Sequence, residues 1–177
     1  DRLKRVLLSF NVKIPTEIKT LAKDLGVNIF ENRIIYRLIE DYKKWCKEEK
    51  EREIRERLEK LPRPAEIRII PGTIFRASHP AIFGVEILRG TLKPGVLMKR
   101  KDGKIIGRIK EIQKEGKTLT EARKGDKVAV SMEEPTVGRQ IKEGDILYSS
   151  LSKKDVEELK RIESYLSEDE KNLLSEL

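Results

Sequence analysis

Apolar residues follow a short, strand-like pattern through the middle of the chain and a helical spacing on either side of it. Between residues 67 and 148 the apolar runs are short, rich in β-branched residues and separated by turns that contain glycine. Short strands at such regular spacing are typical of a closed antiparallel barrel. We therefore predict a β-barrel over residues 62–151.

The first 31 residues predict part of an α/β domain. Residues 3–12 form a strand-like apolar run, Pro15 opens a helix that Gly26 ends, and residues 27–30 form a second short apolar run. Strand, helix and strand in this order indicate a parallel pair. Roughly thirty residues are too few to bury both faces of such a sheet. We therefore expect residues 1–31 to be the remnant of a larger α/β domain.

Helical patterns follow both of these regions. Residues 32–61 contain no helix breaker, and the half after Lys47 is polar on every side, as in a helix that bridges domains through solvent. Two Ser-x-x-acid capping patterns, at Ser152 and Ser167, predict two short helices within residues 152–177. The predicted fold is mixed α and β, with a partial α/β domain, a long connecting helix, an antiparallel barrel and a C-terminal helical pair.

Basic side chains exceed acidic ones, mainly in the barrel. The chain has a net charge of +8, and residues 62–151 hold 18 basic and 11 acidic side chains, whereas residues 152–177 hold 5 and 8. A basic excess makes nucleic acid the first partner to consider. No apolar run approaches the length of a membrane span, and the single cysteine, Cys46, cannot form an internal disulfide. We expect a cytoplasmic protein without a membrane partner.

No residue set indicates catalysis or a metal site. The run Lys114-Glu-Gly-Lys-Thr118 matches a phosphate-binding loop only in part, because Glu111 stands where that loop needs glycine. His79 is the single histidine, and it lacks the Cys or clustered acidic partners of a metal site and a nearby nucleophile. We expect no enzyme activity, metal or cofactor in this chain.

Several runs resemble one known family in the family's own order. The motif G-V-E-x-L-x-G-x-L-K-P-G at 84–95, with G-R-I-K-x-I-Q at 107–113 and G-R-Q-I-x-E-G-D-x-L-Y at 138–148, resembles the domain II type barrel of translational GTPases. More narrowly, it is similar to domain IV of archaeal and eukaryotic initiation factor five-B, a relative of bacterial initiation factor two. F-N-V-K-I at 10–14 and I-I-Y-R-L-I-E-D-Y at 34–42 resemble the end of domain III and the start of its long helix.

The resemblance covers essentially the whole chain and implies a C-terminal fragment of a ribosome-dependent GTPase, whose GTP and Mg sites lie outside it. In this family the barrel holds the aminoacyl CCA end of initiator methionyl-tRNA, and the C-terminal helices bind the tail of initiation factor one-A.

Site residues follow from these implied partners. A single-stranded RNA end needs cations, stacking surfaces and loops that the backbone can approach closely. If the barrel loops share one rim, the candidates for tRNA are Arg76, Ser78, His79, Phe83, Gly84, Lys114, Lys117, Arg123, Lys124, Gly125 and Arg139. The candidates for the factor one-A contact are Leu159, Ile162, Leu166, Leu173, Leu174 and Leu177.

Alternatives stay open for both sets. Phe75 and Phe83 can be core residues, the cations can simply solvate the surface, and the leucines can pack on one another or on the barrel. A second hypothesis is a protein-interaction module, which docks factor one-A or a ribosomal protein without recognising the aminoacyl end.

Overall fold

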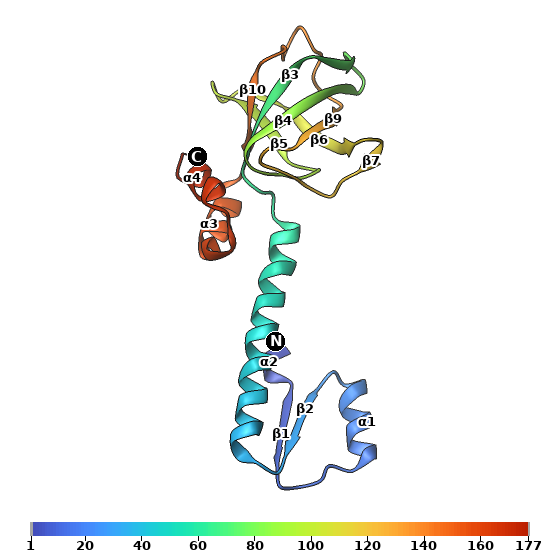
Figure 1. Ribbon diagram of the computed structural model, residues 1–177, viewed down its shortest axis with the longest axis vertical. Helices are drawn as coiled ribbons and strands as arrows, with labels where there is room; N and C mark the ends of the chain where they lie inside the picture. The colour runs from blue at the N-terminus through green and yellow to red at the C-terminus, as the bar shows by residue number, and fades with distance from the viewer. Residues whose placement is uncertain (1, 177) are drawn as a thin grey trace. The chain divides into compact units, whose positions relative to one another are not determined.

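The parallel strand pair predicted near the N-terminus is present in the computed structural model, which describes residues 2–176 and divides into two units, Asp1–Glu59 and Lys60–Leu177 (Figure 1). In the first unit, β1 pairs with β2 from Val6↔Asn28 to Phe10↔Asn32. The elements of this unit are a 3-10 turn at Arg2–Lys4, β1 (Val6–Phe10), α1 (Thr16–Asp24), β2 (Asn28–Asn32) and α2 (Ile35–Lys60).

The long helix begins three residues later than the sequence suggested. Asn32 still belongs to β2, since its carbonyl accepts a hydrogen bond from the amide of Asn11 at 3.0 Å, and its side chain accepts one from the amide of Ile34 at 3.0 Å. The first half of α2 packs on β2 through aromatic rings. The ring of Phe30 lies 6.1 Å from that of Tyr42 and 5.5 Å from that of Trp45.

The solvated half of α2 is supported by ion pairs between residues about one helical turn apart. Arg57 lies 2.7 Å from Glu53, and Arg52 lies 2.5 Å from Glu49. Such exposed pairs each contribute only about 0.2–0.5 kcal/mol. No helix in the described part of the chain is both long enough and apolar enough to span a membrane.

The second unit is the predicted antiparallel barrel. Six strands pair in a ring, in the order β3, β10, β5, β6, β9 and β4, and β4 pairs again with β3. Inward side chains such as Ile67, Phe83, Ile109 and Met132 are fully buried and fill its core. The strands are β3 (Ala65–Arg76), β4 (Ala81–Leu92), β5 (Leu97–Arg100), β6 (Ile105–Lys114), β7 (Lys117–Thr118), β8 (Ala122–Arg123), β9 (Lys127–Met132) and β10 (Ile146–Ser150).

Two helices follow the barrel, as the capping patterns predicted. They are α3 (Lys153–Arg161) and α4 (Glu168–Glu176), with a 3-10 turn at Glu163–Tyr165 between them. Ser152 and Asp155 form a reciprocal capping box at the start of α3. At α4, the amide of Glu170 donates to Ser167 Oγ at 3.3 Å, and the amide of Ser167 donates back to the Glu170 carboxylate at 2.9 Å.

Candidate functional site

The candidate RNA-binding residues form two groups rather than one rim. Arg76 is the last residue of β3, and Ser78 and His79 lie in the turn before β4. Arg139 lies in the 136–141 loop, which is held against the same turn because the amide of Val137 donates to the carbonyl of Ala77 at 2.9 Å. These four candidates therefore lie at one end of the β4–β9 pair, where Ala81 pairs with Met132.

The second group surrounds Asp126, at the other end of β9. Lys114 Nζ lies 2.8 Å from Asp126 Oδ1, and the backbone amide of Arg123 donates to Oδ2 at 2.9 Å. The hydrogen bond from Lys114, together with that from Arg123, lowers the pKa of Asp126. The remaining candidates of this group are Lys117, at the start of β7, and Lys124 and Gly125, in the turn before Asp126.

The length of β9 separates the two groups. The strand runs from Lys127, opposite Glu86, to Met132, opposite Ala81. At about 3.3 Å per residue this is roughly 17 Å. The condition that these loops share one rim is therefore not met in this structure. Instead, the two groups lie at either end of the outer face formed by β4, β9 and β6.

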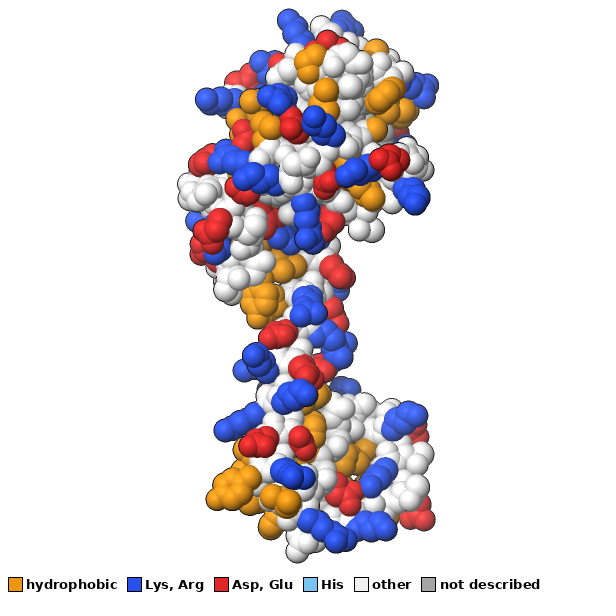
Figure 2. Space-filling model, viewed as in Figure 1, with side chains coloured by type: hydrophobic (Ala, Val, Ile, Leu, Met, Phe, Trp, Pro, Cys, Tyr) orange, Lys and Arg blue, Asp and Glu red, His pale blue; other side chains and the backbone are white. Residues whose placement is uncertain are grey.

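The two groups also differ in how their charges are neutralised. Arg123 pairs with Glu121 at 2.6 Å, and Lys124 pairs with Asp169 at 3.0 Å. Within residues 2–176, neither Arg76 nor Arg139 has an acidic partner within ion-pair distance. On the visible face of the barrel, acidic side chains are interspersed among the basic ones (Figure 2). The cations free to meet a phosphate therefore include those at the Arg76 end.

Three residues on either side of the turn between β3 and β4 have different environments. Phe83 is fully buried in the barrel core, so its ring cannot stack on a base, and the core alternative applies to it. Phe75 is 69% exposed beside Arg76 and does offer a stacking surface. A Cβ added at Gly84 would lie 2.6 Å from Thr73 Oγ1, so Gly84 makes room for this side chain of β3.

A small hollow lies on the outer face between the two groups. Ile82 on β4 pairs with Ser131 on β9, which pairs with Glu111 on β6, so these three residues form one outward row across three strands. The next row contains Ala129 and Gln113. Because β9 contributes only the small side chains of Ala129 and Ser131 to these two rows, a hollow of about 60 Å³ remains. It is lined by Ile82, Glu111, Gln113, Ala129, Val130 and Ser131.

Two polar groups face this hollow with unused hydrogen-bonding capacity. Ser131 is 9% exposed, and its Oγ is the one buried side-chain polar atom in the described part of the chain that lacks a hydrogen-bond partner. Glu111 Oε1 accepts from Thr118 Oγ1 at 2.6 Å and from Gln113 Nε2 at 3.1 Å, which lowers the pKa of Glu111, Thr118 contributing most. Glu111 Oε2 has no partner among residues 2–176.

The comparisons with known proteins agree with this architecture. Residues 63–148 match the family model described as elongation factor Tu domain 4, and residues 1–43 match that of translation-initiation factor 2. The chain is 49% identical, over 97% of its length, to a probable translation initiation factor IF-2 of Hyperthermus butylicus, and 46% identical, over 96%, to that of Pyrobaculum calidifontis. The chain belongs to the translation initiation factor IF-2 family.

A solved member of the IF-2 family has the same fold. The crystal structure of GDP-bound aIF5B from Aeropyrum pernix matches 97% of the chain with a TM-score of 0.69 and 42% identity. The resemblance to initiation factor five-B is therefore confirmed. The chain spans less than a third of these relatives, with 28% and 29% of the two IF-2 sequences and 29% of the aIF5B structure covered.

The leucines proposed for a partner in this family are largely internal. Leu159, Ile162, Leu166, Leu173 and Leu174 are all buried, and Leu177 lies outside the described residues. Leu173 packs beside Gly90 of β4, with its Cδ1 3.1 Å from the position of an added Cβ. The five described side chains therefore fit the alternative in which they pack on one another and on the barrel. Tyr165, 43% exposed, is the accessible aromatic ring of the tail.

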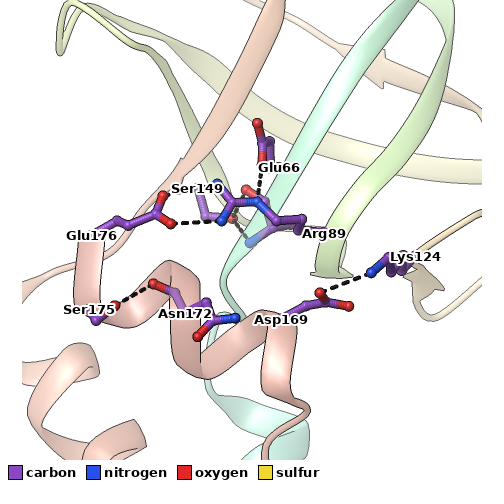
Figure 3. A network of polar contacts seen from close by, with 9 residues as sticks. Glu66, Arg89, Lys124, Ser149, Asp169, Asn172, Ser175 and Glu176 are labelled. Atoms are coloured by element: carbon purple, nitrogen blue, oxygen red, sulfur yellow. Dashed lines mark hydrogen bonds and ion pairs between the residues drawn. The ribbon is translucent and has the colours of Figure 1, made fainter.

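Polar contacts fix α4 to the barrel (Figure 3). Arg89 of β4 donates to Glu176 through Nη1 at 2.7 Å and Nη2 at 2.9 Å, and it also donates to Glu66 of β3. Lys124 reaches Asp169 at the start of the same helix. The charge of Lys124 is therefore paired with the tail in this structure.

Sequence reasoning did not identify Glu111 or Ser131 as site residues. Neither residue belongs to a motif, and each is one polar position in an alternating strand. The sequence did show two small residues, Ala129 and Ser131, alternating with valines in one strand. Small residues in such a pattern predict a shallow region on the barrel surface. What lies beside that strip depends on pairing between β4, β9 and β6, which sequence spacing does not define.

Proposed function

We propose that the chain acts in translation initiation and that its barrel binds the aminoacyl CCA end of initiator methionyl-tRNA on the outer face of β4, β9 and β6. Membership of the IF-2 family supports the process. The observation that carries the proposal for this face is the hollow beside Ser131, whose buried hydroxyl lacks a partner. A buried polar group of this kind costs free energy unless a ligand or water satisfies it.

The surroundings of the hollow suit the end of a single RNA strand. The hollow has room for a few non-hydrogen atoms, so it suits the amino and carbonyl end of the group esterified to the terminal ribose better than a whole nucleotide. Arg76 and Arg139 lie at one end of the face and have no acidic ion-pair partner among residues 2–176, and Phe75 is exposed there. Phosphates and a stacked base therefore belong at the Arg76 end of the face, with the aminoacyl group in the hollow.

The other activities of the family are proposals for the whole protein. We assign GTP and Mg²⁺ binding, and hydrolysis on the ribosome, to regions outside this chain, because residues 114–118 lack the glycine spacing of a phosphate loop. Docking of initiation factor one-A remains a proposal for the tail, where it would use the exposed surface around Tyr165 rather than the buried leucines.

The test is a titration of the chain with initiator tRNA in its methionyl and deacylated forms at one salt concentration. We expect the methionyl form to bind about tenfold more tightly, equivalent to about 1.4 kcal/mol. Ala129→Leu, which fills the hollow, should remove this difference while leaving binding of deacylated tRNA unchanged. Ser164→Leu, an exposed change of similar size in the tail, should retain it.

Equal binding of the two forms by the unmodified chain would contradict the proposal. It would favour the protein-interaction module, in which the basic charge of the barrel only steers association.

A further inference from the structure

The hollow presents a hydrogen-bond acceptor and a hydrogen-bond donor next to each other. Glu111 and Ser131 are register partners on β6 and β9, and side chains paired in this way lie about 4.5–5.5 Å apart at Cβ. Thr118 and Gln113 both donate to Oε1 of Glu111, which orients the carboxylate and leaves Oε2 open. The Ser131 hydroxyl is buried and can donate, because nothing in the described chain accepts from it.

These groups select the chemistry of a ligand. A carboxylate with one open oxygen favours a cation and repels a phosphate or another carboxylate. Ile82, Ala129 and Val130 supply an apolar lining, and the hollow is small, with a volume of about 60 Å³. No group of three or more residues able to hold a metal ion occurs among residues 2–176. The suited ligand is therefore a small organic cation with a neighbouring hydrogen-bond acceptor.

An aminoacyl ester with a free amino group has both features, because its α-ammonium lies one carbon away from its carbonyl. Building on the proposed function, we propose that Glu111 binds the free α-ammonium of the esterified amino acid while the Ser131 hydroxyl donates to the ester carbonyl. On this basis the barrel face distinguishes an aminoacyl end with a free amino group from one that is N-acylated. Glu111 therefore determines specificity for the free amino group, and Ser131 recognises the ester carbonyl.

N-acylation should weaken binding for two reasons. It replaces an ammonium with a neutral amide, which removes the charge that Oε2 would meet, and it adds bulk to a hollow with little spare room. Hydrogen bonds to charged groups correspond to roughly tenfold to hundredfold in affinity. The experiment can separate the two proposed contacts, because the ester carbonyl is present in both the methionyl and the N-acetylmethionyl form, whereas the ammonium is present only in the methionyl form.

The experiment titrates the chain with three forms of initiator tRNA, namely methionyl, N-acetylmethionyl and deacylated. It compares the unmodified chain with Glu111→Gln, Ser131→Ala and a control, Glu133→Gln, which removes the same charge from an exposed residue paired with Lys110. Gln at 111 retains a carbonyl oxygen that can accept from Thr118, so the local fold should persist. Circular dichroism of each variant checks this.

We expect the unmodified chain and Glu133→Gln to prefer the methionyl form over the N-acetylmethionyl form by about tenfold or more. Glu111→Gln should lose this preference and still bind both charged forms more tightly than deacylated tRNA. Ser131→Ala should weaken both charged forms together.

Two results would overturn the inference. One is equal binding of the two charged forms by the unmodified chain, with both tighter than deacylated tRNA, which would leave the proposed function intact. The other is a preference for the methionyl form that persists in Glu111→Gln. Equal binding of all three forms would instead contradict the proposed function as well.

Discussion

Arg63 donates to both carboxylate oxygens of Glu170, through Nε at 2.9 Å and Nη2 at 2.5 Å, and Glu170 is only 1% exposed. Arg63 lies just before β3, and Glu170 lies in the first turn of α4. The same carboxylate also accepts from the amide of Ser167. One buried acidic group therefore caps the last helix and joins it to the start of the barrel.

Breaking this pair should destabilise the barrel unit more than any exposed ion pair. Arg63→Met leaves a buried, unpaired carboxylate, so we expect a loss of about 3–5 kcal/mol in the free energy of unfolding. Urea denaturation followed by circular dichroism measures it. Arg55→Met, which removes an exposed arginine 3.9 Å from Glu51, is the control and should cost less than about 0.5 kcal/mol.

The double variant Arg63→Met/Glu170→Met tests whether the unpaired buried carboxylate causes this loss of stability. It removes both charges, so it should be more stable than Arg63→Met alone. If Arg63→Met is no more destabilising than Arg55→Met, the buried pair does not hold the tail to the barrel.

Gly90 is the glycine at which a side chain should be least tolerated. Its φ is +76°, and an added Cβ would lie 2.1 Å from the carbonyl oxygen of Pro64 and 3.1 Å from Leu173. Gly95 also has a positive φ, +85°, but nothing lies within 4 Å of its added Cβ. Gly95→Ala should therefore cost about 1–2 kcal/mol from backbone strain alone. Gly90→Ala should lower the free energy of unfolding, measured by urea denaturation, by about 2–4 kcal/mol more than Gly95→Ala does. Equal losses for the two variants would show that the close approach to Pro64 is unimportant.

The contact between Arg89 and Glu176 should make stability depend on acidic pH. Hydrogen bonding from Arg89 lowers the pKa of Glu176 below its ordinary value of 4.5. Its stabilising effect is therefore complete above pH 4.5 and is lost as the pH falls through the lower pKa of the folded state.

Melting temperatures of the unmodified chain and of Glu176→Gln, measured from about pH 7 to 3, test this dependence. The difference between them should be constant at higher pH and shrink only under acidic conditions. A difference that does not change with pH would contradict the linkage.

Binding of RNA should depend on salt through the cations at the Arg76 end. Arg76→Ala and Arg139→Ala should each reduce the slope of log affinity against log salt by about 0.7–0.9, as expected for one lost phosphate contact. Lys154→Ala removes the same charge from the exposed surface of α3 and should leave the slope unchanged. Identical slopes for all three variants would mean that phosphates do not contact this end of the barrel.

Local patterns in the sequence predicted the main elements of this fold. Short runs rich in β-branched residues and separated by glycine turns predicted the barrel. Strand–helix–strand order predicted the parallel pair of β1 and β2, and Ser152 and Ser167 predicted α3 and α4. These features depend on neighbours within a few residues, which the sequence displays directly.

The site was harder to predict because it depends on pairing between distant strands. Phe75 and Phe83 look alike in sequence, yet Phe75 is exposed and Phe83 is fully buried. Glu111 and Ser131 are 20 residues apart and meet only through the register of β6 with β9. The leucines of the tail have the apolar spacing of a docking surface, but the barrel already covers Leu173.

The most direct test of the central claim is to locate the aminoacyl end on the barrel. The ligand is a CCA trinucleotide esterified with methionine, added to the ¹⁵N-labelled chain, and the measurement is the change in amide chemical shifts. We expect the largest changes at Ile82, Glu111 and Ser131, with smaller ones at Arg76, and weaker changes at Ser131 with unesterified trinucleotide. Changes confined to α3 and α4, or the same changes with both ligands, would contradict the account.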